Sequence, residues 1–274
     1  MHTQTIDDIA RLIEDARRIL FITGAGLSAD SGLPTYRGIG GLYDSRHTDD
    51  GIPIEAALSG DMLRLRPEVT WKYLLQVESA CRGAGFNLAH RIIAEMEKIK
   101  PETWVLTQNI DCFHRAAGSR QLIEIHGRVD QLLCTHCHYQ EQVTDYSHLT
   151  LPPQCPRCHQ PIRPNVVLFG EMLPNQALQV MHRELLKGFD LVFSVGTTSV
   201  FPYIAQPVLD VRRWGGKAIE INPGLTEVSG FVHYKLPLRA TVALSRIWQA
   251  LGYPMPPMPE PVTQAIRQQS HSPA

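Results

Sequence analysis

Residues 23–38 decide the fold: they read T-G-A-G-L-S-A-D-S-G-L-P-T-Y-R-G and directly follow the apolar run 19–22. This pattern predicts a buried strand that breaks into a glycine turn with G-x-G-x-x-A spacing. Gly24 permits a tight turn, Gly26 lets the backbone approach a pyrophosphate, and Ala29 allows close helix–strand packing. A helix that begins here points its free N–H groups at a phosphate. The spacing alone is weak evidence for nucleotide binding.

The residues after this turn depart from an ordinary dinucleotide-binding fold. Where a long helix and a second strand are expected, the chain has Pro34, Arg37 and the glycine-rich run 38–41. Residues 36–62 are glycine-rich and polar at first and then carry short helical patterns. We therefore predict that 36–62 form a cofactor-binding loop or lid with a small helical segment.

The composition is that of an ordinary globular protein. The chain has 274 residues, 43% of them hydrophobic and 19% charged, with a formal net charge of −1. Without a cluster of Lys and Arg, we expect no direct binding to nucleic acid or to an anionic membrane. The sequence has no apolar stretch long enough for a membrane span and no signal peptide, which predicts a cytoplasmic protein. Its six cysteines are therefore not expected to form three disulfides.

Short apolar runs alternate with helical patterns along most of the chain. The runs lie at 18–23, 103–107, 122–126, 191–195 and 218–221, and helical patterns lie at 6–16, 87–98 and 176–187. This alternation predicts an α/β fold, a doubly wound parallel sheet of the Rossmann type. We assign residues 1–126 and 169–252 to this domain, residues 127–168 to a small inserted domain, and the proline-rich residues 253–274 to a disordered tail.

The insert carries two C-x-x-C pairs with 17 residues between them, Cys134/Cys137 and Cys155/Cys158. Four thiolates at this spacing match a tetrahedral, structural Zn²⁺ site, one per chain, which supplies folding energy that so short a segment lacks. The alternatives are disulfides or redox pairs, iron in a rubredoxin-like site, and replacement of one cysteine by a neighbouring histidine, His136, His138 or His159. The other two cysteines, Cys81 and Cys112, read as ordinary buried thiols.

Polar residues follow the predicted strands at the points where they end. Beyond the opening turn they are Thr107-Gln108-Asn109-Ile110-Asp111, His126-Gly127, Gly196-Thr197-Thr198-Ser199 and Asn222-Pro223. Each cluster has a structural alternative: a helix cap or Asx turn for Asn109 and Asp111, a tight turn and cap for Gly196 and Thr197, and a structural histidine at 126. Five clusters at one sheet edge nevertheless favour a common ligand crevice.

At this point the chain resembles the sirtuin family over about residues 5–250. The matching motifs occur in the family's order: Gly24-Ala25-Gly26-x-Ser28-x-x-Ser31-Gly32, Pro34-Thr35-Tyr36-Arg37, Thr107-Gln108-Asn109-Ile110-Asp111, His126-Gly127, the four cysteines, Phe169-Gly170-Glu171, Gly196-Thr197-Thr198 and Ile221-Asn222-Pro223. The resemblance implies an NAD-dependent protein-lysine deacylase that consumes NAD and releases nicotinamide, O-acyl-ADP-ribose and free lysine. Its partners are acyl-lysine proteins or peptides.

The resemblance also implies roles for residues of this chain. His126 matches the catalytic histidine, which takes a proton from a ribose hydroxyl, and Asn109 belongs with it to the catalytic residues. Main-chain pairing gives modest peptide selectivity and involves Val167, Phe169 and Gly170, which also form the acyl-lysine tunnel. The implied NAD-binding residues are Gly24, Ala25, Gly26, Ser28, Pro34, Thr35, Tyr36, Arg37, Gln108, Asn109, Ile110, Asp111, Gly196, Thr197, Thr198, Asn222 and Pro223.

Three departures from the family pattern bear on function. Tyr36 stands where the family usually has Phe, and the segment before Pro202 is one residue shorter than usual. Leu74 and Val77 occupy the positions of a Tyr/Arg pair that binds acidic acyl groups, so we expect neutral acyl groups such as acetyl. The alternatives are an NAD glycohydrolase or mono-ADP-ribosyltransferase on the same scaffold, and a zinc-stabilised module that only senses NAD.

Overall fold

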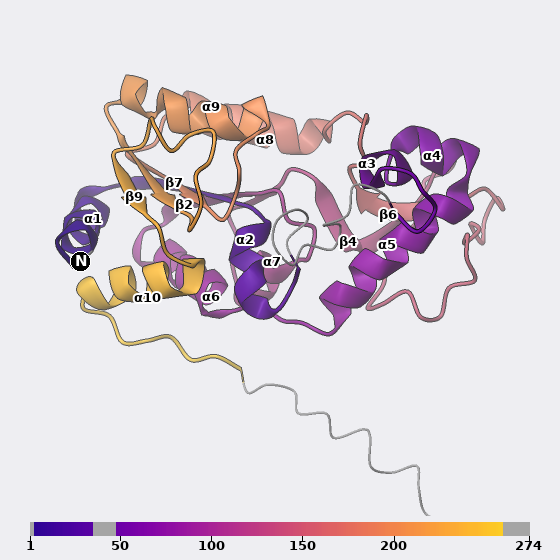
Figure 1. Ribbon diagram of the computed structural model, residues 1–274, viewed down its shortest axis with the longest axis horizontal. Helices are drawn as coiled ribbons and strands as arrows, with labels where there is room; N and C mark the ends of the chain where they lie inside the picture. The colour runs from indigo at the N-terminus through magenta and orange to yellow at the C-terminus, as the bar shows by residue number, and fades with distance from the viewer. Residues whose placement is uncertain (1–2, 35–47, 260–274) are drawn as a thin grey trace, which may run out of the picture.

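The computed structural model describes residues 3–34 and 48–259. Its large sheet has six strands in the order β3-β2-β1-β7-β8-β9, and every pairing is parallel (Figure 1). The order reverses at β1, so the carboxyl ends of β1 and β7 form the switch point where such sheets bind ligands. This topology confirms the predicted doubly wound sheet. The strands are β1 (Arg18–Thr23), β2 (Glu102–Thr107), β3 (Leu122–Glu124), β7 (Leu191–Val195), β8 (Lys217–Ile221) and β9 (Tyr234–Leu236).

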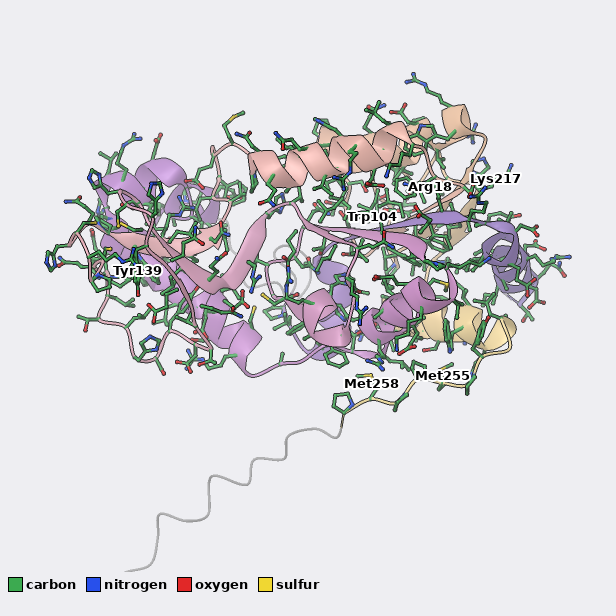
Figure 2. All side chains as sticks on the ribbon, turned by 180° about the vertical axis from the view of Figure 1, so that it is seen from behind. Arg18, Trp104, Tyr139, Lys217, Met255 and Met258 are labelled. Carbon is green, nitrogen blue, oxygen red and sulfur yellow. The ribbon has the colours of Figure 1, made fainter. Side chains whose placement is uncertain are left out.

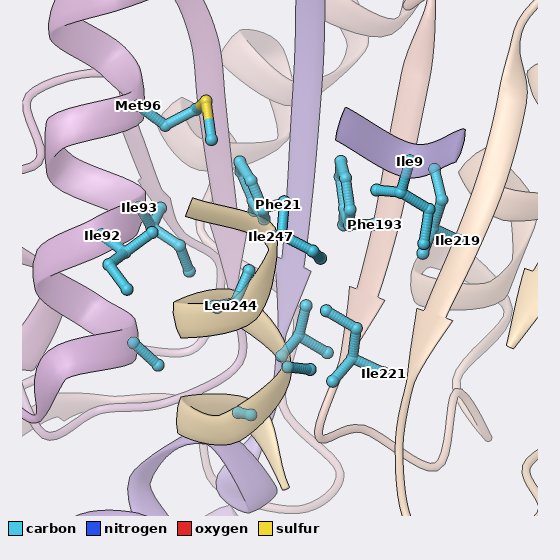
Figure 3. Packing of buried hydrophobic residues seen from close by; sticks show 14 of the residues in the cluster. Ile9, Phe21, Ile92, Ile93, Met96, Phe193, Ile219, Ile221, Leu244 and Ile247 are labelled. Atoms are coloured by element: carbon cyan, nitrogen blue, oxygen red, sulfur yellow. The ribbon is translucent and has the colours of Figure 1, made fainter. Parts of the chain in front are cut away.

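Strand β1 is apolar throughout because both of its faces are covered. Ile19 and Phe21 belong to one hydrophobic cluster, and Leu20 and Ile22 belong to another on the opposite face. Phe21 stacks on Phe193 of the neighbouring strand with ring centroids 4.7 Å apart, in the middle of the first cluster (Figure 3). Because successive side chains of a strand point to opposite faces, β1 contributes to both hydrophobic clusters, and this explains its continuous apolar run.

The helices form a layer on each side of this sheet (Figure 1). The first cluster packs α1 (Thr3–Asp15), α6 (Leu88–Ile99) and α10 (Ala240–Ala250) against the sheet, and the second packs α8 (Asn175–Leu186) and α9 (Pro202–Asp210). Shorter helices follow strand ends, namely α2 (Ala25–Ser28) and α7 (Phe113–Ala117), with 3-10 turns at Ala29–Ser31 and Val211–Trp214. No helix in the described ranges is long and apolar enough to cross a bilayer.

A second, antiparallel sheet has the order β5-β4-β6. Its strands are β4 (Gly127–Cys134), β5 (Gln140–Gln142) and β6 (Ile162–Val166). Three helices, α3 (Ile54–Ala57), α4 (Gly60–Leu65) and α5 (Pro67–Arg82), share its hydrophobic cluster. Trp71 of α5 is fully buried there and donates to the carbonyl of Ile162 at 3.2 Å.

This shared cluster bears on the predicted domain boundaries. We expected residues 36–62 to form a cofactor-binding lid and a small helical segment of the large domain, but α3 and α4, which cover 54–65, pack with the small sheet. We propose that two separate segments, 48–82 and 127–168, make up the small unit. The part of the predicted lid at 36–47 lies outside the described residues.

The chain after α10 stays in contact with the fold over its first residues. Trp248 stacks on Tyr253 with ring centroids 4.9 Å apart and donates to the carbonyl of Pro254 at 2.9 Å. Met255 and Met258 follow on the segment that runs along α10 (Figure 2). The start of the predicted tail is therefore packed, and its remainder, 260–274, lies outside the described residues.

Three elements of the large domain were not predicted. Helix α9 begins with Pro202 and contains Pro207, so its sequence does not read as a helix. Strand β9 has three residues, too few to show a period, and α10 carries no side-chain cap. The strand predicted at 122–126 ends at Glu124, and His126 lies in the turn that leads into the small sheet.

The glycines of the opening turn are needed for contact between two loops. Gly24 has extended backbone (φ −134°), so no left-handed turn requires it there. A Cβ on Gly26 would lie 2.7 Å from the Cα of Gly196, and one on Gly196 would lie 2.4 Å from the nitrogen of Leu27. The Gly26 N–H donates to the Gly196 carbonyl at 2.8 Å. The turns after β1 and β7 therefore touch backbone to backbone.

We predict that Gly196→Ala destabilises the fold by more than about 2 kcal/mol, because left-handed strain and a backbone clash add together. The control is Gly215→Ala, since Gly215 is also left-handed (φ +77°) but a Cβ there meets nothing within 4 Å. It should cost about 1 kcal/mol from strain alone. Urea unfolding of both variants tests this, and equal losses would contradict the contact between the two turns.

Candidate active site at the switch point

Five chain segments meet at the carboxyl ends of the large sheet. Three of them are tied to neighbouring strands by backbone hydrogen bonds to carbonyl oxygens. The Gly24 N–H donates to the carbonyl of Val195 at 3.1 Å and the Gln108 N–H to that of Thr23 at 3.0 Å. The Gly196 N–H donates to the carbonyl of Ile221 at 3.0 Å. The other two, at 126–127 and 222–223, follow β3 and β8. The structure thus brings the predicted polar clusters to one edge of the sheet.

Ser28, Asn109 and Asp111 form one hydrogen-bond network. The Ser28 hydroxyl donates to Asp111 Oδ2 at 2.7 Å and accepts from Asn109 Nδ2 at 3.1 Å. Asp111 Oδ1 accepts the N–H of Phe113 at 2.9 Å, so the carboxylate also closes an Asx turn just before α7, one of the structural roles considered as an alternative. Burial raises the pKa of Asp111, and the bond from Ser28 opposes that shift.

A second network joins the ends of β2, β7 and β8. The Gln108 side chain donates to Thr197 Oγ1 at 2.8 Å, and Asn222 Nδ2 donates to the Thr197 carbonyl at 3.1 Å. The buried Thr197 hydroxyl also accepts the N–H of Ser199 at 3.2 Å. Thr198 is exposed and its carbonyl accepts from Glu227 at 3.2 Å. Among the other predicted positions, Ala25, Pro34 and Ile110 are half-buried and Pro223 is exposed.

His126 lies in the turn between β3 and β4 with defined partners on both ring nitrogens. Its Nδ1 is 3.0 Å from the carbonyl of Gln108, and its Nε2 is 2.7 Å from the hydroxyl of Tyr203. Because a carbonyl only accepts, Nδ1 carries the proton and Nε2 holds the free lone pair. Burial lowers the pKa of His126, which keeps the ring neutral. The geometry suits a general base that acts through Nε2.

The sequence analysis missed two aromatic residues beside this histidine. Phe201 and Tyr203 stack on each other at 5.5 Å, and both rings stand nearly perpendicular to the imidazole. They lie at the start of α9, in the segment that is shorter than the family pattern. The sequence Phe-Pro-Tyr after a polar strand end was the available signal.

The backbone at His126 ties the large sheet to the small unit. The His126 carbonyl accepts the N–H of Val167 at 2.9 Å, and Gly127 pairs with Val166 at the start of β4. Gly127 has φ +77°, and a Cβ there would lie 2.0 Å from the carbonyl oxygen of Asn165. Both ends of the segment 127–168 therefore lie beside the histidine.

The predicted substrate segment, residues 167–170, runs from this crossing to the helices of the small unit. The Phe169 N–H donates to Leu58 at 2.9 Å, and its carbonyl accepts from Gly60 at 3.1 Å. Val167 is half-buried, whereas Phe169 and Gly170 are exposed. The Arg163 guanidinium donates to the carboxylate of Glu171 at 2.8 Å and lowers the pKa of that carboxyl. This ion pair stabilises the turn at the end of the segment. The arrangement leaves a partly apolar segment at the surface, held by backbone hydrogen bonds at Phe169.

The four predicted ligand cysteines come together in the small unit. Their sulfurs all lie within 4.8 Å of one another, with Cys134 and Cys158 at 3.5 Å and Cys137 and Cys155 at 3.6 Å. A tetrahedron with Zn–S bonds of ~2.3 Å needs S–S distances of ~3.8 Å, so the donor set fits Zn²⁺. The N–H groups of residues 136, 137 and 157 donate to these sulfurs, as expected for thiolates.

We predict about one zinc per chain by elemental analysis and a marked loss of thermal stability on treatment with a strong chelator. Cys155→Ser should lower both the metal content and the melting temperature. The control is Cys81→Ser, because burial raises the pKa of the Cys81 thiol to about 12 and it lies outside the cluster. Metal-free protein with unchanged stability, or iron in place of zinc, would contradict this site.

Three predicted NAD-binding residues, Thr35, Tyr36 and Arg37, lie outside the described residues. The described part of the site therefore brings a backbone contact between two turns, an amide–hydroxyl–carboxylate network and a neutral histidine to one edge of the sheet.

Comparison with known proteins agrees with this geometry. The family model for the Sir2 family matches residues 24–202. NAD-dependent protein deacylase 2 of Pseudomonas aeruginosa is 54% identical over 86% of this chain and 93% of its own length, and the Pseudomonas syringae protein of that name is 51% identical over 87% and 97%. A crystal structure of a Sir2 homologue–NAD complex superposes with TM-score 0.80 at 32% identity, covering 89% of this chain and 93% of that one. A Sir2–p53 peptide–NAD+ complex gives 0.75 at 29% identity, over 89% and 98%. This chain belongs to the Sir2 family, the sirtuins.

Proposed function

We propose that the protein is an NAD-dependent protein-lysine deacylase. The observation that carries the proposal is the neutral His126 at the switch point of a dinucleotide-type sheet, with Nδ1–H fixed on a carbonyl and an unprotonated Nε2 that accepts a hydrogen bond from Tyr203. The deacylase names of relatives that cover nearly all of this chain's folded part support it. When bound, NAD supplies the ADP-ribosyl group that accepts the acyl group as nicotinamide leaves.

The residues of the chain divide this work by their chemistry. The touching turns at Gly24–Gly26 and Gly196 carry no side chain where they meet, so the backbone there would be open to close approach by a pyrophosphate. Asp111 and Asn109 offer an acceptor and an amide to the carboxamide of nicotinamide. His126 takes a proton from a ribose hydroxyl at Nε2. Cys134, Cys137, Cys155 and Cys158 would hold Zn²⁺, which would stabilise the small sheet; four thiolate ligands would leave it no open position for catalysis.

The segment 167–170 supports a peptide or protein as the acyl donor. Its residue Phe169 already forms an isolated bridge with Ser59 and backbone hydrogen bonds with Leu58 and Gly60. An added peptide strand would take main-chain bonds from such a segment, with little demand on side chains. A solved Sir2 complex holds a p53 peptide. The predicted cytoplasmic location remains part of this proposal.

One assay tests the function against its alternatives: the protein is incubated with NAD and an acetyl-lysine peptide, and the products are identified by mass. We predict O-acetyl-ADP-ribose that appears only with peptide. Peptide-independent ADP-ribose or an ADP-ribosylated protein would instead support a glycohydrolase or transferase, and intact NAD would support a sensor.

In the same assay, His126→Ala should lower turnover by at least about 100-fold, because general-base catalysis is typically worth 10²–10⁴. NAD affinity should stay within a few-fold. Because burial holds the pKa of His126 below its ordinary value, wild-type kcat/KM should fall with pH only below about 6.5. Near-normal turnover in the variant would contradict the assignment of the base.

We further propose that the preferred acyl group is neutral. Leu74 is buried in the small unit's core and Val77 is half-buried, so neither position offers a cation.

On one peptide, we predict that acetyl-lysine exceeds succinyl-lysine in kcat/KM by at least about 100-fold. Val77→Arg should narrow this ratio by supplying a guanidinium, whereas the uncharged control Val77→Met should not. Equal activity of the wild type on the two acyl groups would contradict a neutral pocket.

A further inference from the structure

The hydroxyl of Tyr203 lies 2.7 Å from Nε2 of His126, the atom that the proposed mechanism uses. Burial raises the pKa of Tyr203 to about 12, so its oxygen keeps the proton. Since Nδ1–H is committed to the Gln108 carbonyl, Nε2 is an acceptor and Tyr203 is the donor. The lone pair needed for catalysis is therefore already occupied.

Only one donor at a time can use this lone pair. A ribose hydroxyl that gives its proton to Nε2 must approach within about 3 Å along the same direction. The tyrosine hydroxyl then has to leave, and the binding of ribose costs the hydrogen bond that it breaks. The Tyr203 hydroxyl, which occupies Nε2 of His126 in the free protein, therefore competes with the ribose hydroxyl when nucleotide binds.

Tyr203 is also well placed to respond to the cofactor. It is the second residue of α9, and α9 follows directly from the loop 196–201 at the end of β7. Ser199 in this loop has a left-handed backbone (φ +57°), and Phe201 stacks on Tyr203. A ligand seated on Gly196 and Thr197 thus bears on the segment that carries the tyrosine. The imidazole is held from one side by Gln108 and from the other by this aromatic pair.

We propose that Tyr203 is a latch on His126: its hydroxyl caps Nε2 in the free protein, presets the imidazole for proton transfer, and is displaced by a ribose hydroxyl when nucleotide binds. The latch rests on the proposed role of His126. It makes Tyr203 a positioning residue, because it acts through the histidine and not on the reacting atoms.

The test compares Tyr203→Phe with the wild type by calorimetry, with ADP-ribose as the ligand. Because the competing hydroxyl is gone, the variant should bind ADP-ribose about five-fold more tightly, which corresponds to the free energy of one ordinary hydrogen bond. The ring that stacks on Phe201 is kept. The control is Tyr253→Phe, which removes a hydroxyl from the exposed ring on Trp248 and should leave the affinity unchanged.

A spectroscopic readout tests the bond itself. In protein labelled with ¹⁵N-histidine, His126 is assigned by the signal lost in His126→Asn among the 12 histidines. We expect the Nδ1–H tautomer in the wild type, with Nε2 shifting downfield in Tyr203→Phe to the value of an unpaired lone pair. ADP-ribose should move the Nε2 resonance upfield in the variant, because a ribose hydroxyl then donates to a lone pair that had no donor. In the wild type the resonance should change less, because the ribose hydroxyl replaces the Tyr203 hydroxyl.

These outcomes separate the latch from the proposed function. Unchanged ADP-ribose affinity together with an unchanged Nε2 shift in Tyr203→Phe would overturn the latch, even if His126→Ala abolishes deacylation. A wild-type spectrum that shows the His126 proton on Nε2 would by itself overturn the latch. Full turnover in His126→Ala would instead remove the proposed base, while the NMR experiment still reports the bond to Tyr203.

Discussion

The site depends on one close contact, between the turns that follow β1 and β7. The Gly26 N–H donates to the Gly196 carbonyl at 2.8 Å, and a Cβ on either glycine would collide with the other turn. This contact sets the width of the switch point. It lets Gln108 reach Thr197 and lets Asn109 donate to the Gly24 carbonyl at 3.0 Å. Polar groups from separate strands are thereby fixed before any ligand arrives, as catalysis by preorganised groups requires.

The small unit is coupled to the site through the two ends of its segment 127–168, which lie beside His126. The four cysteines stabilise the sheet in which β4 begins at Gly127, the residue after the histidine. The His126 carbonyl also accepts from Val167, which leads to the surface strand segment 167–170. A metal held by these four cysteines would therefore act on catalysis only indirectly, by stabilising the turn that carries the base and the segment 167–170.

The sequence predicted the parallel sheet and the residues at its edge because both follow from local patterns. Buried strands such as β1 are continuously apolar, and their polar ends are easy to recognise. Long-range packing was harder to predict. The helices at 54–82 join the small sheet through contacts distant in sequence, such as Trp71 with Ile162, and α9 is obscured by its prolines. Tyr203 was missed for the same reason, since its partner lies 77 residues away. The glycine spacing of the opening turn was recognised, but its main physical reason, contact with Gly196, involves a residue on another strand.

A crystal structure with a non-hydrolysable NAD analogue and an acetyl-lysine peptide tests the central claim most directly. The account predicts the pyrophosphate against the turns at Gly24–Gly26 and Gly196, and a ribose hydroxyl about 3 Å from Nε2 of His126, with Tyr203 displaced from that atom. Nucleotide bound away from the switch point, or a ribose out of hydrogen-bond reach of His126, would contradict it.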